Sequence, residues 1–152
     1  MAEPDDVMQR LGAALELVQA GDRATARARY QQLWDEIGPD GDPLHRCAVA
    51  HSMADVQDDP RHELVWDTRA LEAAELLTDE RVAAAGIAGS ARSFEPSLHL
   101  NLADVHLRLG HRDQVAHHVA AGAATLDALA DDGYRAMIAG ALDRVADALD
   151  DM

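Results

Sequence analysis

The residues of this sequence best suited to chemistry are a thiol, an imidazole and a carboxylate spaced four apart. Cys47, His51 and Asp55 stand at i, i+4 and i+8, so a helix places all three on one face. Cysteine and histidine one turn apart can reach a single zinc ion. Asp55 lies about 12 Å from Cys47 along the helix, too far to join that ion. Further ligands would have to come from other histidines: His45, His62 or His99. We therefore expect a polar helix face or ordinary packing here.

A catalytic interpretation uses the same residues, with Cys47 as nucleophile and His51 as its base. Asp55 and Asp104 are the candidate partners of the imidazole. No glycine-rich loop accompanies the cysteine to form an oxyanion hole. The sequence thus favours a protein that is not an enzyme, with no metal and no cofactor. A second group, Asp113, His117 and His118, is interpreted as an exposed surface cluster.

The charge of the chain limits its partners. The 28 acidic residues outnumber 13 basic ones, all of them arginines, which gives a net charge of -15. Such a charge repels phosphate backbones and anionic lipids, so we expect no nucleic-acid or membrane partner. The simplest role of the negative charge is to keep the protein soluble. If the charge also attracts a partner, that partner segment is basic.

Cellular location is predicted from what the sequence lacks. The acidic start has neither the basic nor the apolar region of a signal peptide, and no run of about 18 apolar residues occurs. Cys47 is the only cysteine, so an internal disulfide is excluded. These features predict a cytoplasmic protein, and they leave self-association open.

The elements that must position these residues are helices. The chain is rich in alanine and leucine, and only 3% of its residues are aromatic. Apolar residues recur at helical spacing between turn and capping signals, which include Asp22 as the cap of the second helix and Asp59 with Pro60 at the start of the fourth. We predict long helices over residues 5–20, 23–37, 43–57, 60–77, 96–109, 112–129 and 133–149.

Three stretches share one ordered pattern. A small residue is followed after seven positions by a turn residue, after five more by a packing residue and after four more by a large residue. They are Ala14, Gly21, Ala26 and Tyr30, then Ala50, Gln57, His62 and Trp66, then Ala103, Gly110, Val115 and Val119. The turn residues are 36 and then 53 residues apart. With a period of about 34, the second gap contains about 19 extra residues, which we assign to a short inserted helix and loop at 78–95.

This pattern resembles the tetratricopeptide repeat. Asn101, Leu102 and Ala103 match the asparagine, leucine and small-residue run of that repeat, and Leu109 with Gly110 matches its turn. The segment from Ala14 to Trp34 is similar, whereas the middle copy departs from the pattern at Gln57 and His62. The motif QDDP, the following tryptophan and the motif PSLHLNLA also resemble small stand-alone repeat proteins of GC-rich bacteria.

The resemblance implies an all-α fold in one domain over residues 1–152. It would be a right-handed stack of three antiparallel hairpins, at about 5–37, 43–77 and 96–129, with a capping helix at 133–149. In such repeats the first helix of each hairpin lines a concave groove. The residues on that face are Leu11, Leu15, Cys47, His51, Asp55, Asn101, Asp104 and Arg108.

The function implied by this resemblance is a scaffold that binds a peptide or partner protein in its groove. Asn101 would hold the backbone or the terminal carboxylate of the bound segment, and Arg108 would bind a carboxylate. Leu11 and Leu15 would form an apolar end. The alternative is a regulatory module that responds to a metal or a small ligand, with residues 78–95 as a lid over the groove.

Overall fold

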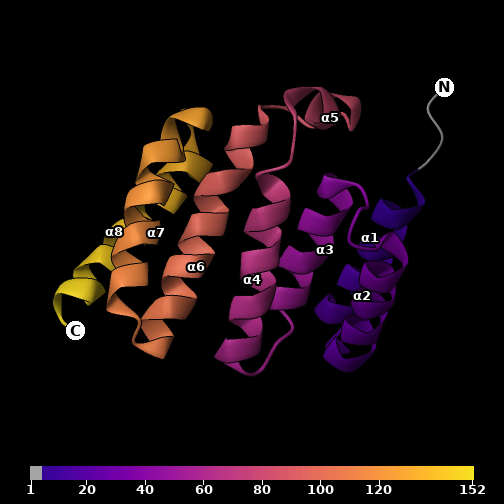
Figure 1. Cartoon of the computed structure of the whole chain (residues 1–152), viewed down its shortest axis with the longest axis horizontal. Coiled ribbons are helices and arrows are strands. Elements are labelled where there is room, and N and C mark those ends of the chain that lie inside the picture. Colours follow the sequence, from indigo (N-terminus) through magenta and orange to yellow (C-terminus); the bar gives the residue numbers. More distant parts are fainter. Residues whose placement is uncertain (1–4) are drawn as a thin grey trace.

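A computed structural model describes residues 5–152, and this part of the chain is helical throughout, without a strand. The predicted all-α class is therefore confirmed, while residues 1–4 of the predicted domain lie outside the described part. The elements are α1 (Asp6–Gln19), α2 (Arg23–Ile37), α3 (Pro43–Ala54), α4 (Pro60–Ala74), α5 (Asp79–Ala84), η1 (Ala91–Phe94), α6 (Glu95–Leu109), α7 (Arg112–Thr125), η2 (Leu126–Ala128) and α8 (Gly133–Asp150). The long helices stand side by side in a row, with α1 and α2 at one end and α7 and α8 at the other, and α5 lies across one edge of the row (Figure 1).

Most of the helices have a capping side chain at their N-terminal end. An aspartate or threonine oxygen accepts a hydrogen bond from a backbone N–H of the first turn, which otherwise has no partner within the helix. The predicted caps Asp22 and Asp59 do this for α2 and α4, with N···O distances of 3.2 and 2.9 Å. The full set of capping residues is Asp5, Asp22, Asp42, Asp59, Thr78 and Asp132.

The helix ends explain where the predicted boundaries were wrong. Gly21 and Gly110 have φ of 89° and 78°, the left-handed conformation that ends α1 and α6. The middle hairpin has no such glycine, and α3 ends at Ala54, three residues before the predicted Gln57. There the amides of Val56 and Gln57 donate to carbonyls three residues back, so the chain leaves the α-helical hydrogen-bonding pattern early. Helix α4 likewise ends at Ala74.

The interior contains two clusters of buried apolar side chains. The larger one joins α1 to α4 and extends to Leu98 and Leu102 of α6. The smaller one consists of Ala103, Val115 and Val145, from α6, α7 and α8. Helix α4 packs against both α3 and α6, so it connects the N-terminal helices to the C-terminal ones.

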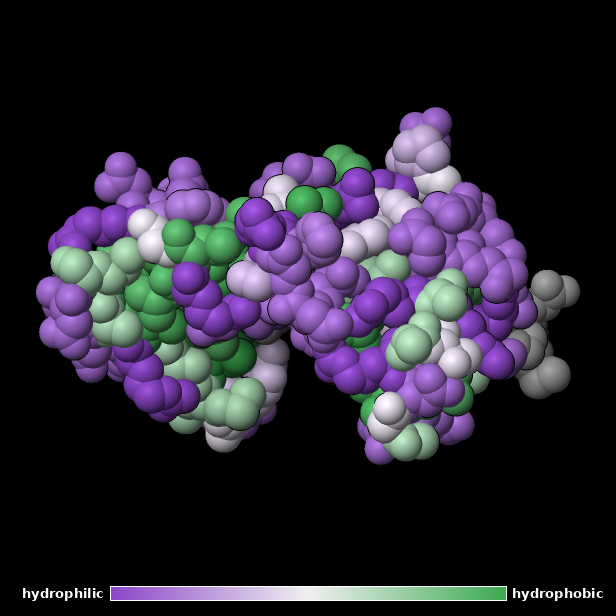
Figure 2. All heavy atoms as spheres, turned by 90° about the horizontal axis from the view of Figure 1, so that it is seen from below, coloured by the Kyte–Doolittle hydropathy of each residue, from purple (hydrophilic) through white to green (hydrophobic). Residues whose placement is uncertain are grey.

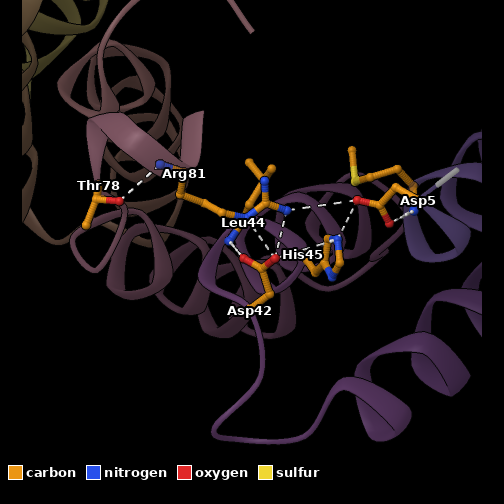
Figure 3. A network of polar contacts seen from close by, with 7 residues as sticks. Asp5, Asp42, Leu44, His45, Thr78 and Arg81 are labelled. Carbon is orange, nitrogen blue, oxygen red and sulfur yellow. Dashed lines mark hydrogen bonds and ion pairs between the residues drawn. The ribbon is translucent and has the colours of Figure 1, made fainter. Parts of the chain in front are cut away.

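The inserted segment is attached to the N-terminal ends of two long helices (Figure 3). Arg81 of α5 donates to Asp42 Oδ2, with distances of 2.9 Å from Nε and 2.7 Å from Nη2. Asp42 also caps α3, and His45 Nε2 lies 2.7 Å from Oδ2 of Asp5, the cap of α1. Burial acts to raise the pKa of Asp42, but the hydrogen bonds from Arg81 and Leu44 hold it below its usual value. Residues of α1, α3 and α5 thus form one polar network.

Candidate binding groove

The residues predicted to line the groove do not all lie together. Exposure to solvent increases along one face of α3 and the residue that follows it. Cys47 is buried, His51 is half-buried and Asp55 is exposed. On α1, Leu11 belongs to the core and is therefore not available to a partner, while Leu15 is 49% exposed. Seen from below, the surface divides into two lobes with a hollow between them (Figure 2).

An apolar pocket lies between α3 and the start of α6. It has a volume of about 250 Å³ and brings the predicted Cys47 and His51 together with residues of η1 and α6. Phe94, the only phenylalanine of the chain, lies at the end of η1 and forms part of the pocket wall. It was not among the predicted groove residues. The lining residues are Leu44, Cys47, Ala48, His51, Phe94, Ser97 and Leu98.

The chemistry of this pocket follows from the burial of its thiol. Burial raises the pKa of Cys47 to about 12. The thiol therefore stays protonated at neutral pH, and a protonated thiol is a poor nucleophile and a poor metal ligand. His51 Nε2 lies 4.0 Å from Asp55 Oδ2, so the pair makes at most a long ionic contact. The pocket is suited to holding an apolar group.

A group of carboxylates lies further along the same two helices, around Asp67 of α4. Asp67 is only 2% exposed, and among the described residues its Oδ2 has no hydrogen-bond partner. The pKa of Asp67 is raised to about 7, mainly by burial and also by the carboxylates of Glu63, Asp55 and Asp104, while Arg108 acts to lower it. The predicted Asp55 and Asp104 are thus brought close to one buried acid.

Asp67 and Glu63 were not among the residues predicted to line the groove. The signal was present, because Asp67 stands next to Trp66 within the apolar stripe of α4, where a charge is out of place. Its meaning depended on α3 and α6 packing on either side of α4, which the spacing within one helix does not reveal.

Arg108 is already occupied by residues of this chain. Its Nη2 donates to Glu63 and lies 3.0 Å from Asp104 Oδ2, and its Nε donates to Asp104 at 3.1 Å. Arg108 therefore neutralises part of the acidic group, and its charge is not free for a carboxylate of a partner.

Asn101 faces a different cavity, between α6 and α8. This cavity has a volume of about 420 Å³, and Asn101 lines it together with Asp104, Arg144 and four apolar residues. Neither Cys47 nor His51 contributes to it. The structure therefore separates the predicted asparagine from the predicted α3 residues, while Asp104 lies near both places.

Five histidines form a row along α6 and α7. His99 and His118 have their Nδ1 atoms 3.1 Å apart, His106 and His111 have theirs 2.9 Å apart, and the rings of His106 and His118 stack. His117 is exposed as expected, but the expectation for His118 was wrong. It lies one turn after Val115, and this position on α7 faces the interior.

The three buried histidines of the row, His99, His106 and His118, have their pKa values lowered by their surroundings, which favours the neutral form. Burial lowers the pKa of His118 to about 4, helped by the nearby charges of His99, His117 and His106. Burial also lowers the pKa of His99 and of His106. Within residues 5–152, no group of three or more potential ligands has the geometry to hold a metal ion.

Comparison with known proteins gives no relative: no family model, curated protein or solved structure matches the chain. Within residues 5–152, none of the helices is both long and apolar enough to cross a membrane.

Proposed function

We propose that the protein is a non-enzymatic interaction module that binds a basic segment of a partner protein between α3 and α6. We call this site the α3–α6 groove and define it by the apolar pocket and the four carboxylates of Asp55, Glu63, Asp67 and Asp104. The single observation that carries the proposal is the buried, unpartnered carboxylate oxygen of Asp67.

A cation from outside would resolve the unfavourable environment of Asp67. A buried carboxylate without a partner costs free energy, and three further carboxylates surround it with only Arg108 to balance them. An arginine or lysine side chain of a partner would provide both a hydrogen bond and a positive charge. The net charge of -15 would also attract a basic segment over a distance.

The resemblance to tetratricopeptide repeats supports the same groove. In that arrangement α1, α3 and α6 would be the first helices of the three hairpins, and their shared face would bind the partner. The left-handed glycines Gly21 and Gly110, at equivalent positions of the first and third copies, agree with this architecture. The alternative lid over residues 78–95 would require Arg81 to leave Asp42.

The proposal is tested by NMR titration of the isotope-labelled protein with N-acetyl-arginine amide. We expect saturable shifts of the amide signals of Asp55, Asp67 and Asp104 and none with N-acetyl-glutamine amide, which lacks the charge. The Asp67→Asn variant should lower the affinity at least fivefold. Asp147→Asn, which removes an exposed acid of α8, should leave it unchanged. Equal shifts with both ligands, or full binding by Asp67→Asn, would refute the proposal.

A further inference from the structure

The apolar pocket and the acidic group lie on the same two helices, at successive levels. Helix α3 provides Cys47, Ala48 and His51 to the pocket, and the residue after its end, Asp55, lies near Asp67. Helix α6 provides Ser97 and Leu98 to the pocket and Asp104 to the acidic group. Because both helices run from the pocket towards the acids, the two parts follow one another along the groove.

The separation of the two parts suits a short stretch of extended peptide. From Ala48, in the pocket, to Asp55 is seven residues, or about 10 Å of helix at 1.5 Å per residue. An extended chain in the polyproline II conformation advances about 3.1 Å per residue and has three residues per turn, so two side chains three residues apart point to the same side and would reach both parts.

The acidic part favours arginine over lysine. A guanidinium presents several N–H donors in one plane, so it can bind Asp67 Oδ2 and a second carboxylate at once. Asp55, which follows the last residue of α3, and Asp104 of α6 both lie near enough to Asp67 to raise its pKa. A lysine ammonium is more strongly hydrated and loses more on entering such a site.

We propose that the α3–α6 groove recognises an extended segment with an apolar side chain in the pocket and an arginine, three residues away, on Asp67. This inference rests on the proposed function and adds the pocket as a second point of recognition. The pocket excludes charged residues from the first position, because among its lining side chains only His51 is ionisable besides the protonated Cys47.

The test compares blocked tetrapeptides by NMR titration: acetyl-Leu-Gly-Gly-Arg-amide, acetyl-Arg-Gly-Gly-Leu-amide and acetyl-Gly-Gly-Gly-Arg-amide. The first two cover both chain directions. We expect one of them to bind about tenfold more tightly than the glycine peptide, because it buries most of a leucine side chain. Replacing its arginine by lysine should weaken binding, and replacing it by glutamine should abolish binding.

Variants separate the two parts of the groove. Ala48→Leu and Ser97→Leu each fill the pocket and should remove the tenfold gain while leaving the binding of N-acetyl-arginine amide intact, which also shows that the groove is folded. Ala28→Leu, at an exposed position of α2, is the matched control. If N-acetyl-arginine amide binds but leucine adds no affinity in either order, the further inference is overturned and the proposed function stands. If N-acetyl-arginine amide does not bind, both are overturned.

Discussion

Arg81 Nε donates a hydrogen bond to Oδ2 of Asp42, and Arg81 Nη2 forms an ion pair with the same oxygen, so this contact attaches the inserted helix to the first turn of α3. The pair is partly shielded from water, with about 70% of each side chain covered, and Asp42 also serves as the helix cap. Arg81 therefore provides a charged contact between the inserted segment and the N-terminal helices, in addition to the apolar packing of Ala91 and Phe94 against the larger core cluster.

We predict that Arg81→Gln loosens the inserted segment. Hydrogen exchange should become faster across residues 79–94, and the free energy of unfolding should fall by about 1 kcal/mol, because a partly shielded charged hydrogen bond is lost. Arg61→Gln, which breaks the exposed pair with Asp59, should change neither measurement. Unchanged exchange in Arg81→Gln would show that the segment is held by other contacts.

A second prediction concerns the stability cost of Asp67. Its pKa of about 7 in the folded protein exceeds the ordinary value of 3.8, so the folded state binds more protons than the unfolded state between these limits. This residue therefore reduces stability as pH rises from about 4 to about 7. Asp67→Asn should be about 1 to 2 kcal/mol more stable than the wild type at pH 8 in urea unfolding, and equally stable or less stable at pH 4.

The histidine row gives the opposite dependence on pH. Because the pKa of His118 is lowered to about 4 from 6.5, the unfolded state binds the extra proton in this range. Stability contributed by a neutral His118 is full above pH 6.5 and is lost as pH falls towards 4. Between pH 7 and pH 5, the free energy of unfolding of His118→Phe should therefore fall by about 1 kcal/mol less than that of the wild type. His62→Phe, on the exposed face of α4, is the control and should follow the wild type.

Replacing Gly110 and Gly12 by alanine should change the free energy of unfolding in opposite directions. Gly110 has φ of 78°, so Gly110→Ala is strained and should cost about 1 kcal/mol or more. Gly12 lies inside α1, and a Cβ placed there meets no atom within 4 Å. Gly12→Ala should therefore raise the free energy of unfolding by about 0.5 to 1 kcal/mol. Thermal unfolding of both variants checks the pair, and a stabilising Gly110→Ala would contradict the assigned turn.

The sequence could predict what depends on neighbouring residues and not what depends on distant ones. Asp59 and Pro60 identified the start of α4, and Gly110 identified the end of α6, because caps and left-handed turns are local. The raised pKa of Asp67 depends in part on Asp55 and Asp104, which come close only because α4 packs against both α3 and α6. Phe94 likewise reached the pocket only through the path of the inserted segment.

The side-chain register across two helices was the hardest part to predict. Asn101 and Cys47 both fall on the predicted groove face of their own helices, yet they line separate cavities. Helical spacing fixes the direction of a side chain relative to its own helix axis. It does not fix how far neighbouring helices are rotated or how far apart they stand.

The position of the two tryptophans has a consequence for how the unfolding of this protein is followed. Trp34 and Trp66 meet edge to face, with ring centroids 5.1 Å apart, and both belong to the larger of the two core clusters. Their fluorescence therefore reports on the N-terminal helices and is insensitive to α7 and α8. Circular dichroism reports on all helices equally, so a difference between the two unfolding curves would reveal that the halves of the row melt separately.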